Sequence, residues 1–198
     1  MARTTGGLEE VDDRVRAKGG EATLVPLDLR DGPAIDRLGG VLASRYGRLD
    51  VLIGNAAELG VLSPVGHVDP KVFERVMALN AGVNQRLIRS LDPLLRVTEA
   101  GRAIFVTCAP AREPRPFWSA YAASKAALEA LVLSYAAETR RSRVRVNLVD
   151  PGPLRTRLRA KAYPGEAPDK VPLPETRTDA FVALADPDCQ RHGELIVA

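Results

Sequence analysis

Short apolar runs alternate with stretches of helical periodicity along this chain, and that alternation constrains the fold more than any single residue does. The runs typical of buried strands are residues 22–27, 51–53, 103–107, 144–149 and 194–197. Segments with apolar residues at helical spacing lie at 7–17, 31–46, 70–97, 119–140 and 178–184. Strands joined by helical crossovers pair in parallel, with helices on both faces of the sheet. The sequence therefore predicts a three-layer α/β fold of the doubly wound type.

The chain of 198 residues is long enough to bury a substantial core, and no repeat or composition shift divides it. We therefore expect residues 1–198 to form a single domain. No stretch approaches the roughly 18 uninterrupted apolar residues of a membrane span, and the first residues lack the apolar core of a signal peptide. Two cysteines make no disulfide framework, which favours a cytoplasmic location.

Charge and motif content exclude several kinds of partner. The net charge is only +3, and the arginine-rich run at 140–145 has no interleaved aromatic residues. A nucleic-acid surface normally combines basic and aromatic side chains, so we expect no nucleic-acid partner. The chain also lacks the spacing of a metal site. The expected ligand is a small molecule.

Tyr121 and Lys125 are the first candidates for chemistry. They lie four residues apart in the predicted helix 119–140, so they share one face of that helix. An ammonium beside a phenol favours the phenolate and lowers the Tyr pKa toward a range useful for proton transfer. A Tyr-x-x-x-Lys match alone is weak, but three further motifs stand in a fixed order around it: Asn55-Ala56-Ala57 after a strand, Asn80 within a long helix, and Asp150-Pro151-Gly152-Pro153-Leu154-Arg155-Thr156 after a strand.

Together these motifs resemble the short-chain dehydrogenase/reductase family over nearly the whole chain. The resemblance implies a Rossmann-type sheet and an NAD(P)-dependent oxidoreductase that interconverts a carbonyl and an alcohol by hydride transfer. It assigns the acid/base role to Tyr121. Lys125 then lowers the Tyr pKa and binds the nicotinamide ribose, and Asn80 anchors a water that relays protons.

The family's catalytic serine has no hydroxyl at its usual position here, because Cys108 occupies the matching position at the end of the strand 103–107. Thr107 or Ser119 could substitute for it, although neither has the family's spacing. A thiol donates a much weaker hydrogen bond than a hydroxyl. Cys108 is therefore either a weakened fourth catalytic residue or a small buried filler, and the sequence favours neither.

The resemblance also assigns the cofactor-binding positions. Arg3 matches a place where a guanidinium contacts the adenosine 2′-phosphate, which favours NADP over NAD, although it can equally be a solvated terminal charge. The remaining positions are Asp28, Leu29, Asn55, Ala56, Ala57, Pro151, Gly152, Leu154 and Thr156, together with Tyr121 and Lys125.

The strand, glycine-rich turn and helix that bind the cofactor pyrophosphate in this family have no match in the sequence. We therefore expect a Rossmann-type domain without its N-terminal β-α unit, in which residues 22–27 and 51–53 pair directly. Two functions stay open. The chain is either an NADP-dependent reductase shortened at its start, or an inactive form that assembles with a full-length relative. In both cases the helices 70–97 and 119–140 are the expected oligomer interface.

The substrate region comprises residues 109–119 and the segment after Thr156, which we expect to be a Pro- and charge-rich loop. The five large or rigid apolar residues in these stretches predict a partly apolar pocket for the carbonyl or alcohol substrate: Pro114, Pro116, Phe117, Trp118 and Tyr163.

Overall fold

A computed structural model describes all residues from 1 to 198. Four parallel strands form one sheet in the order β1-β2-β3-β4. They are β1 (Val51–Gly54), β2 (Arg102–Val106), β3 (Arg145–Asp150) and β4 (Leu195–Val197). The two central strands are buried along almost their whole length, as expected for parallel strands covered on both faces.

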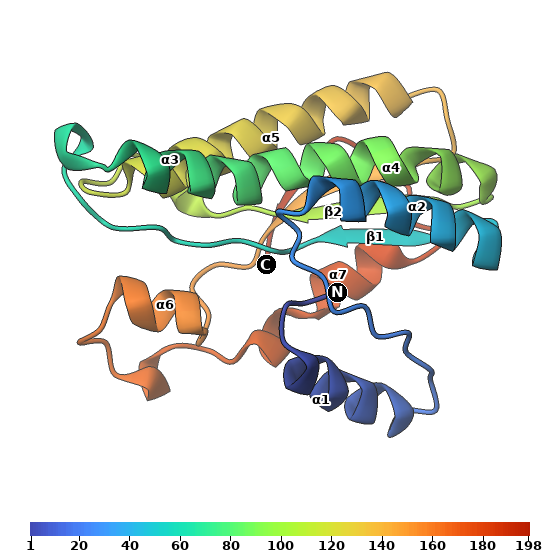
Figure 1. Ribbon diagram of the computed structural model, residues 1–198, viewed down its shortest axis with the longest axis horizontal. Helices are drawn as coiled ribbons and strands as arrows, with labels where there is room; N and C mark the ends of the chain where they lie inside the picture. The colour runs from blue at the N-terminus through green and yellow to red at the C-terminus, as the bar shows by residue number, and fades with distance from the viewer.

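Helices cover both faces of this sheet (Figure 1). One face carries α2 (Gly32–Tyr46), α3 (Pro70–Met77), α4 (Val83–Val97) and α5 (Ser119–Thr139), and the other carries α7 (Asp179–Ala185). The helices α1 (Thr5–Arg16) and α6 (Arg157–Ala162) lie on the same side as α7. The parallel sheet between helical layers confirms the predicted α/β fold class. None of these helices is both long and apolar enough to cross a lipid bilayer.

The main core fills the space between the sheet and the layer made by α2, α4 and α5. Sixteen buried apolar residues form it, including Leu91 and Leu95 from α4, Phe105 from β2 and Leu128 from α5. A smaller cluster of Ile104, Val149 and Leu184 joins the opposite face of the sheet to α7. Burial of apolar surface on both faces holds the carboxyl ends of the strands in place.

Capping residues in the sequence account for both ends of α2. The Asp31 side chain accepts a hydrogen bond from the backbone N–H of Ala34 at 3.1 Å, and Pro33 sits in the first turn. Gly47 ends the helix with φ of 69°, a left-handed conformation that glycine adopts without steric cost. The predicted helix 31–46 is therefore confirmed.

The predicted long helix 70–97 forms with a change of winding at its centre. A π-helical turn, Ala78–Gly82, separates α3 from α4, so the helix bulges at its centre. Asn80 lies within this turn and is fully buried. The predicted helices 7–17, 119–140 and 178–184 are confirmed within two residues at each end.

Residues 22–27 do not form the predicted strand. A single parallel bridge joins Ala2 to Pro26, and the Leu27 N–H donates to the Ala2 carbonyl at 2.9 Å. An apolar run becomes a strand only where a neighbour supplies partners along its length, and Ala2 supplies them at one point only. The expected pairing of residues 22–27 with 51–53 is also wrong, because β1 pairs with β2 alone. A second miss is α6, which forms in the segment after Thr156 that was expected to be a loop.

Candidate active site

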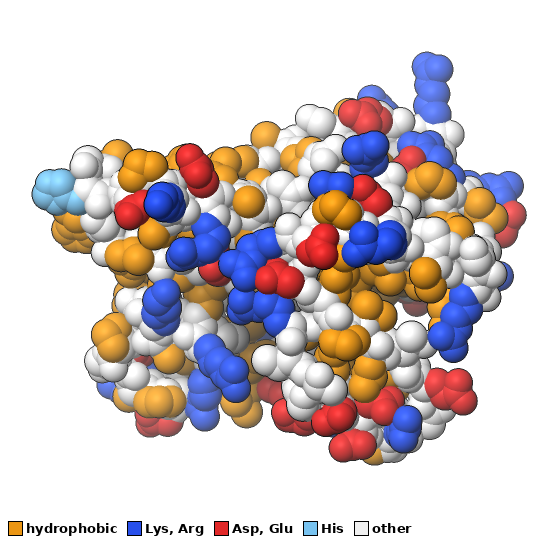
Figure 2. Space-filling model, in the orientation of Figure 1, with side chains coloured by type: hydrophobic (Ala, Val, Ile, Leu, Met, Phe, Trp, Pro, Cys, Tyr) orange, Lys and Arg blue, Asp and Glu red, His pale blue; other side chains and the backbone are white.

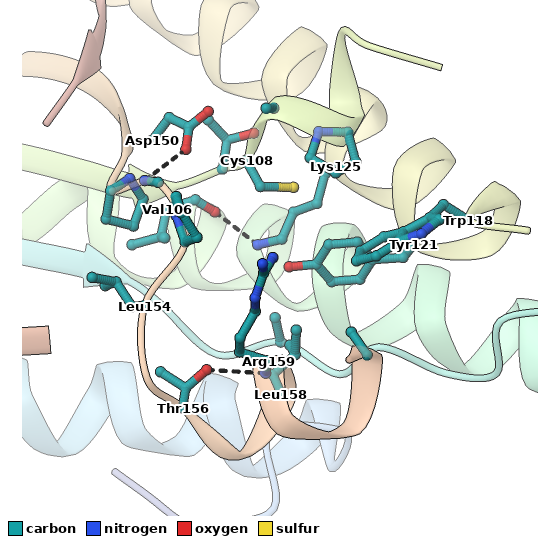
Figure 3. A pocket seen from close by; sticks show the side chains of 18 of the residues that line it. Val106, Cys108, Trp118, Tyr121, Lys125, Asp150, Leu154, Thr156, Leu158 and Arg159 are labelled. Atoms are coloured by element: carbon teal, nitrogen blue, oxygen red, sulfur yellow. Dashed lines mark hydrogen bonds between the residues drawn. The ribbon is translucent and has the colours of Figure 1, made fainter. Parts of the chain in front are cut away.

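The carboxyl ends of β1, β2 and β3 open into a cavity of about 580 Å³, which α5 and α6 close from the sides (Figure 3). This is the edge at which open parallel sheets normally bind ligands. Nine of the predicted catalytic and cofactor-binding residues line the cavity: Asn55, Ala57, Cys108, Tyr121, Lys125, Pro151, Gly152, Leu154 and Thr156.

Tyr121 and Lys125 lie one turn apart on the buried face of α5. Both are almost inaccessible, with 7% and 2% of their surface exposed. The Lys125 ammonium donates to the carbonyl oxygen of Val106 at 2.7 Å and lies 6.0 Å from the centre of the Tyr121 ring. The end of β2 therefore fixes the ammonium, and the helix brings the phenol beside it.

Burial dominates the electrostatics of this pair. It lowers the pKa of Lys125 to about 8, because the charged ammonium loses most of its hydration. Burial also raises the pKa of Tyr121 well above its ordinary value, and the adjacent Cys108 and Asp150 add to that rise. The direction for Tyr121 is opposite to the sequence-based expectation. The ammonium that was expected to stabilise the phenolate is instead directed at the Val106 carbonyl.

Cys108 follows β2 directly and is close enough to the Tyr121 hydroxyl for each group to alter the pKa of the other. The thiol is half-buried in the cavity wall, and burial raises its pKa. The structure thus brings together three of the four predicted catalytic residues, Cys108, Tyr121 and Lys125.

Asn80, the fourth, does not line the cavity. Its side-chain oxygen accepts from the backbone N–H of Glu58 at 2.8 Å, and its amide donates to the Glu58 carbonyl and to the Ser124 hydroxyl, each at 2.9 Å. Asn80 therefore ties the loop after β1 to α5, one residue from Lys125. In this structure its side chain acts as a structural link beneath the site.

The turn after β3 shapes the lower edge of the cavity. Asp150 ends the strand, and its Oδ1 accepts from the backbone N–H of Gly152 at 3.0 Å. Gly152 has φ of 70°, so a side chain at this position would strain the turn. Thr156 then begins α6, because its hydroxyl accepts from the backbone N–H of Arg159 at 3.2 Å.

A cluster of charges at the cavity, with buried carboxylates and a partly exposed arginine, was missed from the sequence. Arg112, in the loop after β2, donates to Glu129 on α5 and to Asp150 Oδ2, the latter at 2.6 Å. The Thr107 hydroxyl also donates to Glu129, at 2.6 Å. Glu129 lies four residues after Lys125 on the same helical face, and that spacing is the one sequence signal for its position.

The outer wall of the cavity is aromatic and cationic. The Trp118 ring lies 5.8 Å from that of Tyr163 and 5.9 Å from that of Tyr121, measured between ring centres. Arg115 and Arg159 line the same wall. Trp118 and Tyr163 were predicted here, whereas Phe117 is mostly exposed, and Pro114 and Pro116 lie outside the lining.

The positions expected at the adenosine end do not join this cavity. Arg3, Asp28, Leu29 and Ala56 are absent from its lining. Arg30 donates to Asp28 Oδ2 at 2.7 Å and holds the pKa of that carboxyl at about 2, with a further contribution from the charge of Arg3. Arg3 and Asp28 are therefore close to each other but apart from Tyr121 and Lys125.

Comparison with known proteins points to one family. A family model described as short chain dehydrogenase matches residues 1–167. An uncharacterized oxidoreductase of Escherichia coli, YciK, is 36% identical over 150 residues, which are 76% of this chain and 59% of that protein. A fatty acyl-CoA reductase of Mycobacterium tuberculosis is 38% identical over 134 residues, 66% of this chain and 45% of that protein. The chain thus spans less than two thirds of the length of these relatives.

A solved structure with the same family description has the same fold. A short chain dehydrogenase of Shigella flexneri 2a, complexed with NADP, superposes with a TM-score of 0.93 at 31% identity. The superposition covers 98% of this chain and 83% of that one.

Proposed function

The chain belongs to the short-chain dehydrogenase family, and on this premise we propose that it interconverts a carbonyl compound and an alcohol with NADP, using Tyr121 as the acid/base. The observation that carries the proposal is the buried pair of Tyr121 and Lys125 in the wall of a cavity at the carboxyl edge of the sheet. A phenol and an ammonium in that position can exchange a proton with a ligand oxygen.

The residues support the following division of roles in the reductive direction. When bound, reduced NADP supplies the hydride that the carbonyl carbon receives. A phenol is protonated at neutral pH, and burial raises the pKa of Tyr121 further, so its hydroxyl is available to donate to the carbonyl oxygen. Lys125 supplies positive charge beside the phenol below its pKa of about 8. The Cys108 thiol adds a weak hydrogen bond to the same oxygen.

The residues that could hold NADP divide into a nicotinamide end in the cavity and an adenosine end outside it. The nicotinamide end fits, since Lys125, Asn55 and the turn from Pro151 to Thr156 present an ammonium, an amide, backbone groups and a hydroxyl to one space. For the adenosine end we assign Arg3 to the 2′-phosphate, with Asp28 beside it. The NADP bound in the Shigella relative supports the choice of NADP over NAD.

The test is a pair of measurements on the 198-residue chain and on Tyr121→Phe. NADPH oxidation in the presence of small aldehydes and ketones reports turnover. Energy transfer from Trp118, the only tryptophan, to NADPH reports cofactor binding independently of turnover. We expect Tyr121→Phe to lose at least about a hundredfold in turnover, the size of a general acid contribution, while binding NADPH with nearly unchanged affinity. Equal turnover by both proteins would rule out Tyr121 as the acid.

A further inference from the structure

The outer wall of the cavity has an uneven charge distribution. The charged residues in the lining are Arg115, Lys125, Asp150 and Arg159. Asp150 is paired with Arg112, which lies outside the lining. The lining therefore carries three cationic groups and one carboxylate, and the ion-pair partners of Asp150, Arg159 and Arg115 all lie outside it.

Arg159 has hydrogen-bonding capacity left for a ligand. It reaches from α6 into the cavity, toward the hydroxyl end of Tyr121 (Figure 3). Its Nε and Nη2 each donate to Glu166 at 2.6 Å, and its guanidinium carbon lies 3.8 Å from the centre of the Tyr163 ring. Nη1 takes no part in the pairing with Glu166, so one edge of the planar group is turned away from that carboxylate.

Arg115 is held weakly. Its Nη2 donates to Glu113 at 3.2 Å, but the Glu113 side chain is 66% exposed, and an ion pair so open to water contributes little. Its Nη1 lies 3.5 Å from the Tyr163 hydroxyl. Neither Glu113 nor Glu166 lines the cavity, so the guanidinium groups face the ligand while their carboxylate partners do not. Figure 2 shows Lys and Arg side chains gathered near the middle of one face of the molecule.

Aromatic surface accompanies these cations. Trp118 packs against Tyr121 on one side and Tyr163 on the other. A flat apolar group can lie on these rings, with its carbonyl at Tyr121 and a charged substituent at the arginines.

We propose that the preferred substrate is a carbonyl compound with a flat apolar body that also carries a carboxylate, and that Arg159 and Arg115 hold this carboxylate. The carbonyl part of this proposal rests on the proposed function, and the carboxylate part rests on the two arginines alone. A guanidinium matches a carboxylate with two parallel hydrogen bonds, which a neutral ester cannot reproduce.

The test compares 4-formylbenzoate with its methyl ester, which has the same ring and aldehyde but no charge. Quenching of Trp118 fluorescence measures the binding of each to the wild-type chain without cofactor. We expect the acid to bind at least about tenfold more tightly, the value of one charged hydrogen bond. Equal binding of the two compounds, or no binding of the acid at millimolar concentration, overturns the proposal.

Variants test whether the preference for the acid over the ester depends on the cavity arginines. Arg159→Gln should reduce the acid-to-ester preference to below about threefold, and Arg115→Gln should reduce it partly. Arg157→Gln removes the same charge from an exposed position of α6 outside the cavity, so it should keep the full preference. A loss of preference in Arg157→Gln equal to that in Arg159→Gln would refute the assignment to the cavity arginines. The wild-type comparison needs no variant and stands even if a variant misfolds.

NADPH oxidation with the same two compounds separates this inference from the proposed function. Reduction of both at comparable kcat/KM, with equal binding, contradicts the carboxylate preference and supports hydride transfer. Preferential binding of the acid without reduction of either compound supports the anion site and contradicts the proposed function.

Discussion

Arg112→Met removes the cation that pairs with Glu129 and Asp150 behind the active site, and we expect it to destabilise the fold and the site together. The two carboxylates are well buried, with side chains 13% and 5% exposed. Without Arg112 they face each other's charge in a medium of low dielectric. Because the segment after β2, α5 and the turn after β3 meet at this cluster, we expect its loss to loosen all three segments that carry the proposed catalytic side chains.

The size of the effect follows from burial. Breaking a buried ion pair by removing one partner costs about 3–5 kcal/mol. Here the cost is smaller, because the Arg112 side chain is 35% exposed and water can partly replace it. Thr107 still donates to Glu129, and Gly152 still donates to Asp150. We expect a loss of about 2–3 kcal/mol in the free energy of unfolding, which corresponds to a fall in Tm of roughly 5–10 °C for a chain of this size.

Urea unfolding at pH 7 measures this loss. Arg140→Met is the matched control, because Arg140 is exposed and forms no ion pair, and it should stay within about 0.5 kcal/mol of wild type. Adding Glu129→Gln to Arg112→Met removes one of the unpaired charges and should restore part of the stability. A loss below about 0.5 kcal/mol for Arg112→Met, or no recovery in the double variant, would refute the reasoning.

Three further predictions concern the predicted catalytic residues. Burial lowers the pKa of Lys125 from 10.5 to about 8, so between these pH values the folded chain binds fewer protons than the unfolded chain. The free energy of unfolding of the wild type should therefore rise by roughly 3 kcal/mol relative to Lys125→Met as the pH increases through this interval. A difference in urea unfolding that does not change with pH would contradict this prediction. Cys108→Ser replaces a weak donor with a stronger one and should raise kcat roughly tenfold; a lower kcat in steady-state assays would assign Cys108 a role in packing alone. Asn80→Ala leaves the Glu58 N–H and the Ser124 hydroxyl without their buried partner, so it should lower the free energy of unfolding, measured by thermal unfolding, by about 3 kcal/mol. A loss under 1 kcal/mol would show that the link is dispensable.

Helices could be predicted from the sequence where the residues that set their ends act within the helix itself. Asp31, Pro33 and Gly47 set the ends of α2 through contacts within the helix itself, so the sequence predicted this helix correctly. Residues 22–27 have the apolar composition of a strand, but a strand also depends on a neighbour, and that dependence is not local. The helix α6 was missed because Thr156 caps it within a segment whose prolines and charges indicate a loop.

The candidate site could likewise be predicted only where residues close in the sequence determine it. The spacing of Tyr121 and Lys125 placed both on one face of α5, and the carboxyl edges of parallel strands brought Cys108 and Gly152 to them. Their pKa values depend on burial and on the direction in which the ammonium points, which spacing does not specify. The Arg112 cluster was missed because its partners are 17 and 38 residues away in the sequence.

The most direct test of the central claim is the transfer of label from NADPH deuterated at the transferred position of its nicotinamide to 4-formylbenzoate. Mass spectrometry of the alcohol product follows the label. We expect one deuterium on the carbinol carbon with the wild-type chain and only traces of product with Tyr121→Phe. Unlabelled product, or no product from a chain that binds both NADPH and the aldehyde, would contradict it.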